Sequence, residues 1–451
     1  MFNRQILTNL RQWVKSENRK PLVLRGARQV GKTTAAELFS REFDSFLYVN
    51  LERPGETGFF NRNLPVRELF QAIALSKNIP APQGRCLLFI DEIQNSPEAV
   101  AYLRYFYEEM KDLFVIAAGS LLESMMSKGA ISFPVGRIEF LRMYPLTFSE
   151  YLEAMNLEQL SSAFSVVPLP QYAGEALLKE FHTYALIGGM PEAIAAYTKN
   201  HSVIECNRIY QNLMTSFLDD IPKYARNHSL ALIMRHCIEN VPFEAGKRIA
   251  FARFGKSEYR SREAGEALKT LERAMLIYLL QPSTSTEQPI IPDLKKATRL
   301  QFIDTGLLNF CAGLQQQYFN MENLQAIYRG LLAEHIVGQE LIATSEDATK
   351  LPHFWVRESP QSNAEVDFLY LYRNTVVPIE VKAGSVGTLR SLHQFMQHSK
   401  HDMAVRLYSG KIDLQECETP DRKKFRLLNL PYFLASQVEK YLEWASTQVI
   451  G

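Results

Sequence analysis

A short stretch near the start of the chain has the residue types that bind phosphate. Residues 26–33 read GARQVGKT, which matches the pattern GxxxxGK[ST] at every fixed position. The two glycines let the backbone turn its N–H groups toward phosphate oxygens, the lysine adds a positive charge, and the threonine hydroxyl can coordinate Mg²⁺. The residues that the loop would contribute to a nucleotide site are Gly26, Ala27, Arg28, Gln29, Val30, Gly31, Lys32, Thr33 and Thr34.

The loop lies where a buried strand would meet a helix. Residues 21–25, PLVLR, form an apolar run typical of a strand, and residues 32–43 have the apolar spacing of a helix. This order places a helix N-terminus at the phosphates, where the helix dipole favours negative charge. The context favours a phosphate loop over the alternative, a glycine-rich turn near a solvated lysine.

A second apolar run supplies acidic residues for the same site. Cys86 to Ile90 suits a strand buried on both faces of a parallel sheet, and Asp91 and Glu92 follow it. Parallel sheets bind ligands at the carboxyl ends of their strands, so we expect Asp91 to hold Mg²⁺ and Glu92 to polarise the attacking water. The alternative is that two carboxylates merely end a strand. A further run ends at Ser120, whose hydroxyl would either sense the γ-phosphate or cap a helix.

These motifs together resemble a known family. GARQVGKTT, LLFIDEIQ, IAAGSLLE and PVGRIEFLRMYPLTFSEYL are similar, in this order, to segments of bacterial and archaeal AAA-type ATPases whose uncharacterised C-terminal domain is related to PD-(D/E)xK nucleases. The resemblance covers about residues 1–440 and implies a P-loop fold, ATP and Mg²⁺. It also implies that an arginine completes the site, in some cases from a neighbouring subunit, which leaves a homo-oligomer open. Arg137 is the first candidate and Arg28 the second; the alternative is a surface ion pair.

The C-terminal part of the chain contains a second chemical pattern. Asp367 lies in the alternating run Val366–Tyr372, and Glu380 and Lys382 end the run Val376–Lys382, which returns as the second arm of a hairpin. Side chains two residues apart on a strand point to the same face. We therefore expect Glu380 and Lys382 to lie on one side of the hairpin.

Aspartate, glutamate and lysine in this order form the PD-(D/E)xK pattern of metal-dependent nucleases. Asp367 and Glu380 would bind Mg²⁺ beside the scissile phosphate, and Lys382 would orient the attacking water or lower its pKa. Glu334, on the preceding helical stretch, is placed to complete the metal site. The alternative is a retained fold whose acids only form ion pairs.

The middle of the chain is predicted to hold two smaller parts. The expected domains are a P-loop ATPase domain (1–155), a helical lid (156–230), a winged-helix-like module (231–297) and an α/β nuclease-like domain (298–451). The lid follows from the family resemblance. Six cations interleaved with Phe251, Phe254 and Tyr259 suit phosphate contacts and base stacking, against the alternative of a solvated charged face. The cations are Lys247, Arg248, Arg253, Lys256, Arg260 and Arg262.

The composition limits the class of protein. The chain has 451 residues, 46% hydrophobic and 22% charged, with a formal net charge of +1, so a nucleic-acid surface has to be local. Five separated cysteines without a CxxC pair suit reduced thiols. No run has the length and apolarity of a signal-peptide core or a membrane span, so we expect a cytoplasmic protein without a membrane partner.

Two functional hypotheses follow for this α/β chain. In the first, an ATPase uses its nucleotide state to gate Mg²⁺-dependent cleavage of DNA by the C-terminal domain. In the second, the chain is a nucleotide-dependent switch that binds nucleic acid or a protein partner and does not cleave.

Overall fold

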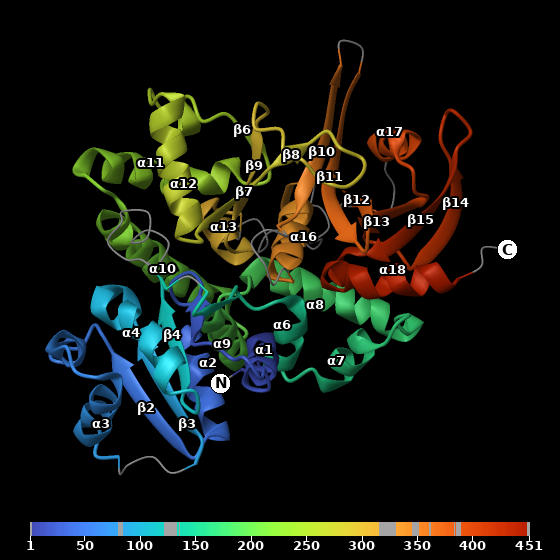
Figure 1. Ribbon diagram of the computed structural model, residues 1–451. Coiled ribbons are helices and arrows are strands. Elements are labelled where there is room, and N and C mark those ends of the chain that lie inside the picture. Colours follow the sequence, from blue (N-terminus) through green and yellow to red (C-terminus); the bar gives the residue numbers. More distant parts are fainter. Residues whose placement is uncertain are drawn as a thin grey trace. The chain divides into compact units, whose positions relative to one another are not determined.

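A computed structural model of the chain describes residues 2–79, 84–120, 133–134, 136–314, 331–344, 351–359, 362–382, 384 and 389–448 (Figure 1). Two groups of segments form separate compact units. The first unit comprises Met1–Tyr144, Phe217–Ala231 and Arg273–Leu276. The second comprises Pro145–Ser216, Leu232–Glu272 and Ile277–Gly451.

The first unit contains a parallel sheet of five strands in the order β2-β3-β4-β1-β5. Every residue of β3 and β4 is buried, as expected for strands with helices on both faces. The predicted α/β fold with a parallel sheet is confirmed for this part of the chain. Its strands are β1 (Leu22–Arg25), β2 (Ser45–Asn50), β3 (Cys86–Asp91), β4 (Phe114–Gly119) and β5 (Glu139–Arg142).

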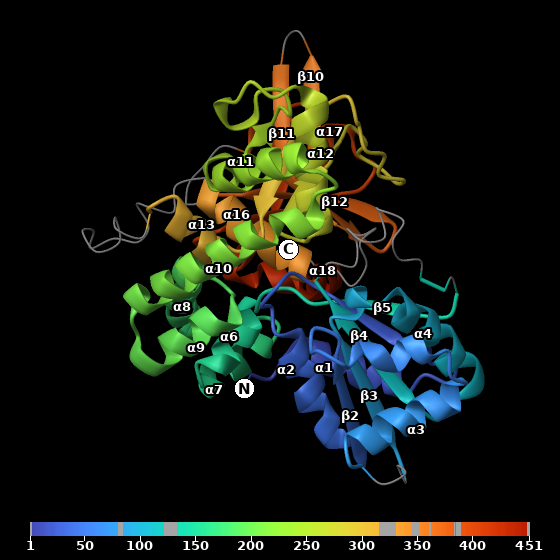
Figure 2. The same ribbon diagram turned by 90° about the vertical axis from the view of Figure 1, so that its left-hand side faces the viewer.

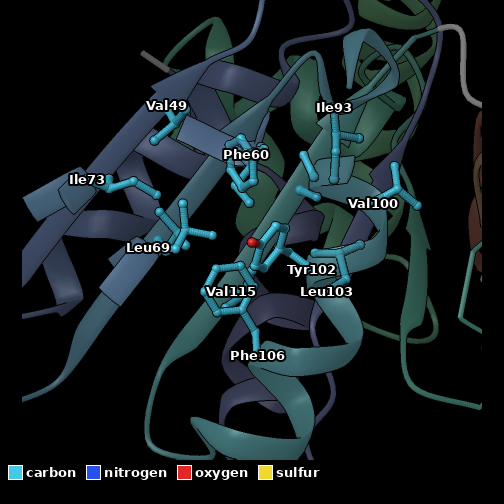
Figure 3. Packing of buried hydrophobic residues seen from close by; sticks show 14 of the residues in the cluster. Val49, Phe60, Leu69, Ile73, Ile93, Val100, Tyr102, Leu103, Phe106 and Val115 are labelled. Carbon is cyan, nitrogen blue, oxygen red and sulfur yellow. The ribbon is translucent and has the colours of Figure 1, made fainter. Parts of the chain in front are cut away.

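Helices cover both faces of this sheet. Helices α3 (Val66–Ser76) and α4 (Pro97–Glu109) pack their apolar side chains against one face. Figure 3 shows this cluster, where Phe60 and Tyr102 lie among the aliphatic side chains, and the Tyr102 hydroxyl donates a hydrogen bond to the carbonyl of Leu64 at 2.7 Å. Helices α1 (Gln5–Val14) and α2 (Lys32–Phe39) lie on the other side of the sheet (Figure 1).

The second unit contains a mixed sheet of seven strands in the order β14-β15-β13-β12-β11-β10-β8. Strand β11 pairs antiparallel with both β10 and β12, so the predicted hairpin is present (Figure 2). The strands are β8 (Pro282–Ser283), β10 (His353–Ser359), β11 (Ser362–Tyr372), β12 (Thr375–Val381), β13 (Met403–Tyr408), β14 (Asp413–Glu418) and β15 (Lys424–Pro431). Helix α17 (Arg390–His398) packs on one face of this sheet, where Phe395 meets Trp355 edge to face.

A smaller antiparallel sheet in this unit has the order β6-β9-β7. Its strands are β6 (Arg248–Ile249), β7 (Ile277–Leu280) and β9 (Thr298–Phe302). The other α-helices in the described residues are α6 (Phe148–Ala154), α7 (Glu158–Ser165), α8 (Gly174–Ile187), α9 (Pro191–Asn200), α10 (Val203–Tyr224), α11 (His228–Glu244), α12 (Ser261–Arg273), α13 (Thr305–Cys311), α16 (Leu331–Ala343) and α18 (Val438–Thr447). In the described part of the chain, no helix has the length and apolarity needed to cross a membrane.

A buried aspartate joins α8, α10 and α13. Asp304 caps α13 and accepts hydrogen bonds from the backbone N–H of Leu307 at 2.8 Å and of Gly189 at 2.6 Å, and from the Tyr210 hydroxyl at 3.1 Å. Gly188 ends α8 with φ of 68°, a left-handed conformation that glycine adopts without strain. Helix α8 therefore ends at Gly188, and α9 begins at Pro191.

Replacing Asp304 with asparagine is expected to lower the free energy of unfolding by about 1–3 kcal/mol, because both carboxylate oxygens accept from N–H or O–H donors. The amide NH₂ of asparagine would have to face one of those donors. Chemical denaturation at neutral pH measures the change. The exposed Asp413→Asn serves as the control, and equal stability of the two variants would contradict the prediction.

Candidate nucleotide and carboxylate sites

The glycine-rich loop joins β1 to α2 as predicted. Gly31 precedes the helix with φ of 96°, and Gln29 has φ of 64°, so the loop twice adopts left-handed backbone. A Cβ atom at Gly26 would lie 2.5 Å from the carbonyl oxygen of Met143, so only glycine fits there. These two glycines let the backbone follow a path that leads N–H groups toward the N-terminus of α2.

Lys32 lies buried at the first position of α2. Its ammonium group donates to the carbonyl oxygens of Gly26 at 2.9 Å and Ala27 at 2.8 Å. Burial lowers the pKa of Lys32 to about 8, against the opposing effects of Glu92 and Asp91. The lysine is thus folded back over the loop, close to both acidic residues that the sequence assigns to the site.

The acidic residues lie at the end of β3, next to the loop. The Thr33 hydroxyl donates to Asp91 Oδ2 at 2.7 Å, and the Tyr48 hydroxyl donates to the same oxygen at 3.2 Å. Glu92 has left-handed backbone and accepts a hydrogen bond from Gln94. Burial raises the pKa of Glu92; the bond from Gln94 lowers it, and the charge of Asp91 raises it. Thr33 and Asp91, the pair expected to hold Mg²⁺, are therefore already in contact.

The two candidate arginines form ion pairs in different places. Arg137 Nε lies 2.9 Å from Glu108 Oε1 in an exposed ion pair, which is the alternative that the sequence left open. Arg28 forms an ion pair with Asp220 on α10, within the first unit. Ser120 directly follows β4 and is half-buried. No sequence signal connects Asp220 with the loop, because the two are 192 residues apart.

The second candidate site lies at α16, β11 and β12. Trp355 pairs with Val366 and His353 with Leu369, so β11 carries one residue more than β10 in this interval. Asp367 lies within this bulge, and its Oδ2 accepts the backbone N–H of Val381 on β12 at 2.7 Å. Bulges redirect side chains and are common beside active sites. The sequence did not reveal this bulge.

The partner residues follow from the hairpin and the helix. Lys382 Nζ donates to Glu380 Oε1 at 2.6 Å, so these two side chains lie on the same side, as predicted. The other oxygen, Glu380 Oε2, is buried without a hydrogen-bond partner among the described residues. Glu334 lies in the first turn of α16.

The three carboxylates affect one another. Burial and the neighbouring charge of Asp367 raise the pKa of Glu334 to about 7 and that of Glu380 to about 8. Burial also raises the pKa of Asp367, although Arg299 and the N–H of Val381 lower it. The surroundings of the three acids therefore disfavour their ionised forms.

Arg299 on β9 is the main counter-charge that the sequence did not reveal. Its guanidinium donates to the backbone carbonyl of Asp367 at 2.8 Å and pairs with Glu365, and its Nη2 lies 3.7 Å from Asp367 Oδ1. Only 4% of its side chain is exposed. The carbonyl oxygen belongs to the bulge, so Arg299 satisfies an acceptor there as well as compensating charge.

The carboxylates fit a hydrated Mg²⁺ better than a fully protein-ligated metal. Among the described residues, no three His, Cys, Asp or Glu side chains are grouped closely enough to hold a metal ion. Mg²⁺ commonly takes only one or two carboxylates and completes its shell with water and substrate phosphate. The unpaired Glu380 Oε2 is one free oxygen ligand of the required type.

The basic segment 247–262, which runs into the first turn of α12, has both exposed and buried side chains. Arg253, Lys256, Arg260 and Arg262 are exposed, whereas Phe254 is buried with 3% exposure. The expected stacking of bases on Phe254 is therefore wrong, because the ring belongs to the core of the second unit. Lys247 forms an ion pair with Glu244. Arg248 forms ion pairs with Glu358 and Glu365.

Three segments of the chain match known protein families. Residues 18–152 match a family described as an AAA domain, residues 178–318 a domain of unknown function (DUF8612), and residues 329–432 another domain of unknown function (DUF4143). The N-terminal part of the chain is thus an AAA-type P-loop ATPase domain, and such domains bind ATP and typically Mg²⁺. No curated protein matches the chain.

Several solved structures are distantly similar. The Walker-type ATPase PABY2304 of Pyrococcus abyssi is 14% identical with a TM-score of 0.44, over 69% of this chain and 96% of that chain. The Thermotoga maritima RuvB Holliday junction branch migration motor is 16% identical with a TM-score of 0.29, over 65% and 93%. The Aeropyrum pernix ORC1 protein in complex with DNA is 12% identical with a TM-score of 0.27, over 71% and 95%.

Proposed function

We propose that this chain hydrolyses ATP and that its nucleotide state gates a metal-dependent nuclease in the C-terminal domain, which acts on DNA. The observation that carries the nuclease half is the cluster of Glu334, Asp367 and Glu380 beside Lys382, with one buried carboxylate oxygen that has no hydrogen-bond partner among the described residues. Carboxylates that raise one another's pKa in a buried place are common at functional sites.

The loop residues have distinct roles in the proposed ATPase reaction. The N–H groups of the loop bind the phosphates, and Lys32 leaves its two carbonyl partners to reach the β- and γ-phosphates. Thr33 and Asp91 would hold Mg²⁺, which would neutralise charge on the phosphates. Glu92 orients a water that attacks the γ-phosphorus as its bond to the ADP oxygen breaks, and Ser120 contacts the γ-phosphate.

The C-terminal residues would also have distinct roles, in the proposed cleavage of DNA. One or two of Glu334, Asp367 and Glu380 would ligate Mg²⁺ directly and the others through water, and the ion would stabilise charge on the scissile phosphate. Lys382 holds Glu380 and orients the attacking water. Burial raises the pKa of these acids, and a bound cation would lower it again because it favours the ionised carboxylates.

The same proposal assigns the domains and the DNA surface. We assign a P-loop domain to 1–155, a lid to 156–230, a winged-helix-like module to 231–297 and the nuclease-like domain to 298–451. The order α11, β6, α12, β7, β9 with the sheet β6-β9-β7 supports a winged-helix arrangement. The exposed Arg253, Lys256 and Arg260 before α12 and Arg262 in its first turn would supply phosphate contacts, without base stacking on the buried Phe254.

The alternative function is a nucleotide-dependent binding switch with an inactive nuclease-like domain. Two observations favour it: Arg299 already compensates Asp367 and Glu365, and no group of three metal-binding side chains is present among the described residues. In that case the acids only form ion pairs.

The deciding experiment compares the wild type with Asp367→Ala on single-stranded, duplex and branched DNA, with Mg²⁺ or Mn²⁺ and with or without ATP. We expect the variant to lose cleavage while ATP hydrolysis persists. Asp413→Ala, at an exposed position of β14, is the matched control. Wild-type ATP hydrolysis without cleavage of any substrate would favour the binding switch.

A further inference from the structure

One residue of the phosphate loop forms an ion pair with a buried acid on a helix that is distant in sequence. Arg28, the third residue of the loop, pairs through Nη1 with Asp220 on the last turns of α10, and both belong to the first unit. Asp220 also pairs with Lys223 at 2.8 Å. This contact joins the loop to a helix far away in sequence.

The two side chains of this pair differ in exposure. Asp220 is 4% exposed, whereas Arg28 is 35% exposed. The ion pair with Asp220 uses Nη1 of Arg28, so Nε and Nη2 are not part of this contact. A planar guanidinium held by one nitrogen offers its remaining donors in a defined direction, which suits two-point contact with a phosphate.

The charges around Arg28 belong to the nucleotide site. The charges of Glu92 and Glu52 act on Arg28, and the charge of Arg28 acts on Lys32. The guanidinium therefore interacts electrostatically with Glu92 and Lys32, two residues of the proposed ATPase reaction. Arg137, by contrast, is paired with Glu108 on the surface.

Asp220 is suited to hold this position because it stays ionised. Burial by itself would raise the pKa of Asp220, but the hydrogen bonds from Arg28 and Lys223 outweigh burial and lower it. Tyr224, one turn further along α10, also lies in the field of Asp220, Arg28 and Glu92. A rigid helix that carries an ionised acid gives the arginine a fixed anchor.

We propose that Asp220 is a positioning residue of the ATPase site, which holds Arg28 so that its remaining donors contact the γ-phosphate from within the same chain. This inference rests on the proposed ATP hydrolysis and makes Arg28 the arginine that completes the site. Arg28 then stabilises charge that develops on the phosphoryl oxygens, and Asp220 acts only through Arg28.

The test is a double-mutant cycle in the full-length protein with Arg28→Ala, Asp220→Ala and the double variant. We expect each single variant to lower kcat for MgATP on the order of 10²-fold, as for a displaced catalytic group. The KM should change much less than kcat. Asp220→Ala should cost nothing further in the Arg28→Ala background, because coupled residues are not additive.

Three controls separate positioning from folding and from a failed premise. Asp219→Asn, an exposed neighbour on α10, should behave as wild type, and Asp220→Glu should recover part of kcat. Circular dichroism and binding of MgADP show whether the Asp220→Ala variant is folded. If the effects on kcat are additive, or if folded Asp220→Ala keeps wild-type kcat, the inference is wrong. If the wild type does not hydrolyse ATP, the proposed function itself fails.

Discussion

Replacing Lys32 with methionine is expected to lower ATP turnover by about 10²- to 10³-fold, the usual loss when a charged group at a phosphoryl centre is removed. Lys32 is buried and lies in the field of Asp91 and Glu92, so its removal takes a positive charge out of the place where the phosphates would bind. Methionine retains most of the apolar stem, and its flexible side chain fills the space at the start of α2. Steady-state release of phosphate from MgATP measures the change.

The variant has to be compared with a lysine from the same unit. Lys111→Met removes an exposed lysine and should leave turnover unchanged. Both proteins should retain the circular dichroism of the wild type. Wild-type turnover in Lys32→Met would show that the phosphates are not bound by this loop, and it would remove the basis for the ATPase assignment.

The sequence allowed the phosphate loop to be predicted because its function depends on backbone path. Gly26 is needed where the backbone passes close to the carbonyl oxygen of Met143, and Gly31 is needed where the backbone adopts a positive φ. Both requirements are visible in the spacing of the two glycines. The acids after β3 could be placed for a similar reason, since a fully buried strand has to end at the ligand edge of a parallel sheet. In these cases, neighbouring residues carry the information.

Asp220 and Arg299 could not be predicted, because their partners lie 192 and about 66 residues away and no local pattern marks them. Each is a buried charged side chain that is stabilised by an ion pair with a residue distant in sequence. The bulge at Asp367 depends on the register between β10 and β11, which the sequence of one strand does not express. The burial of Phe254 likewise depends on packing within the second unit, so its aromatic character was misleading.

The two sites differ in how their charges are balanced. At the loop, Lys32 is a buried cation close to two acids, so an incoming nucleotide has a positive partner. At the C-terminal site, acids outnumber the cations Arg299 and Lys382, which is the balance expected where a cation binds. Arg299 therefore distinguishes the two hypotheses for the C-terminal domain, because it is the charge that keeps the acids together without metal.

Replacing Arg299 with methionine is expected to lower the free energy of unfolding by about 3–5 kcal/mol, the usual cost of removing one partner from a buried ion pair. Glu365 and Asp367 would lose their counter-charge, and the carbonyl of Asp367 in the bulge would lose its donor. Denaturation in urea, followed by tryptophan fluorescence (Trp355 lies on β10), measures the loss. Arg373→Met, at a position where 66% of the side chain is exposed, should change the stability little.

Divalent cations then separate a metal site from a set of ion pairs. If the acids can hold Mg²⁺ or Mn²⁺, either ion should restore part of the stability of Arg299→Met, because binding to the native state alone shifts the equilibrium toward it. The double variant Arg299→Met/Asp367→Asn should be more stable than Arg299→Met without metal, since one uncompensated charge is gone, and it should gain less from the ions. Equal stabilisation of both variants by the ions would show that Asp367 is not a ligand. No stabilisation of Arg299→Met would favour the binding switch over the nuclease.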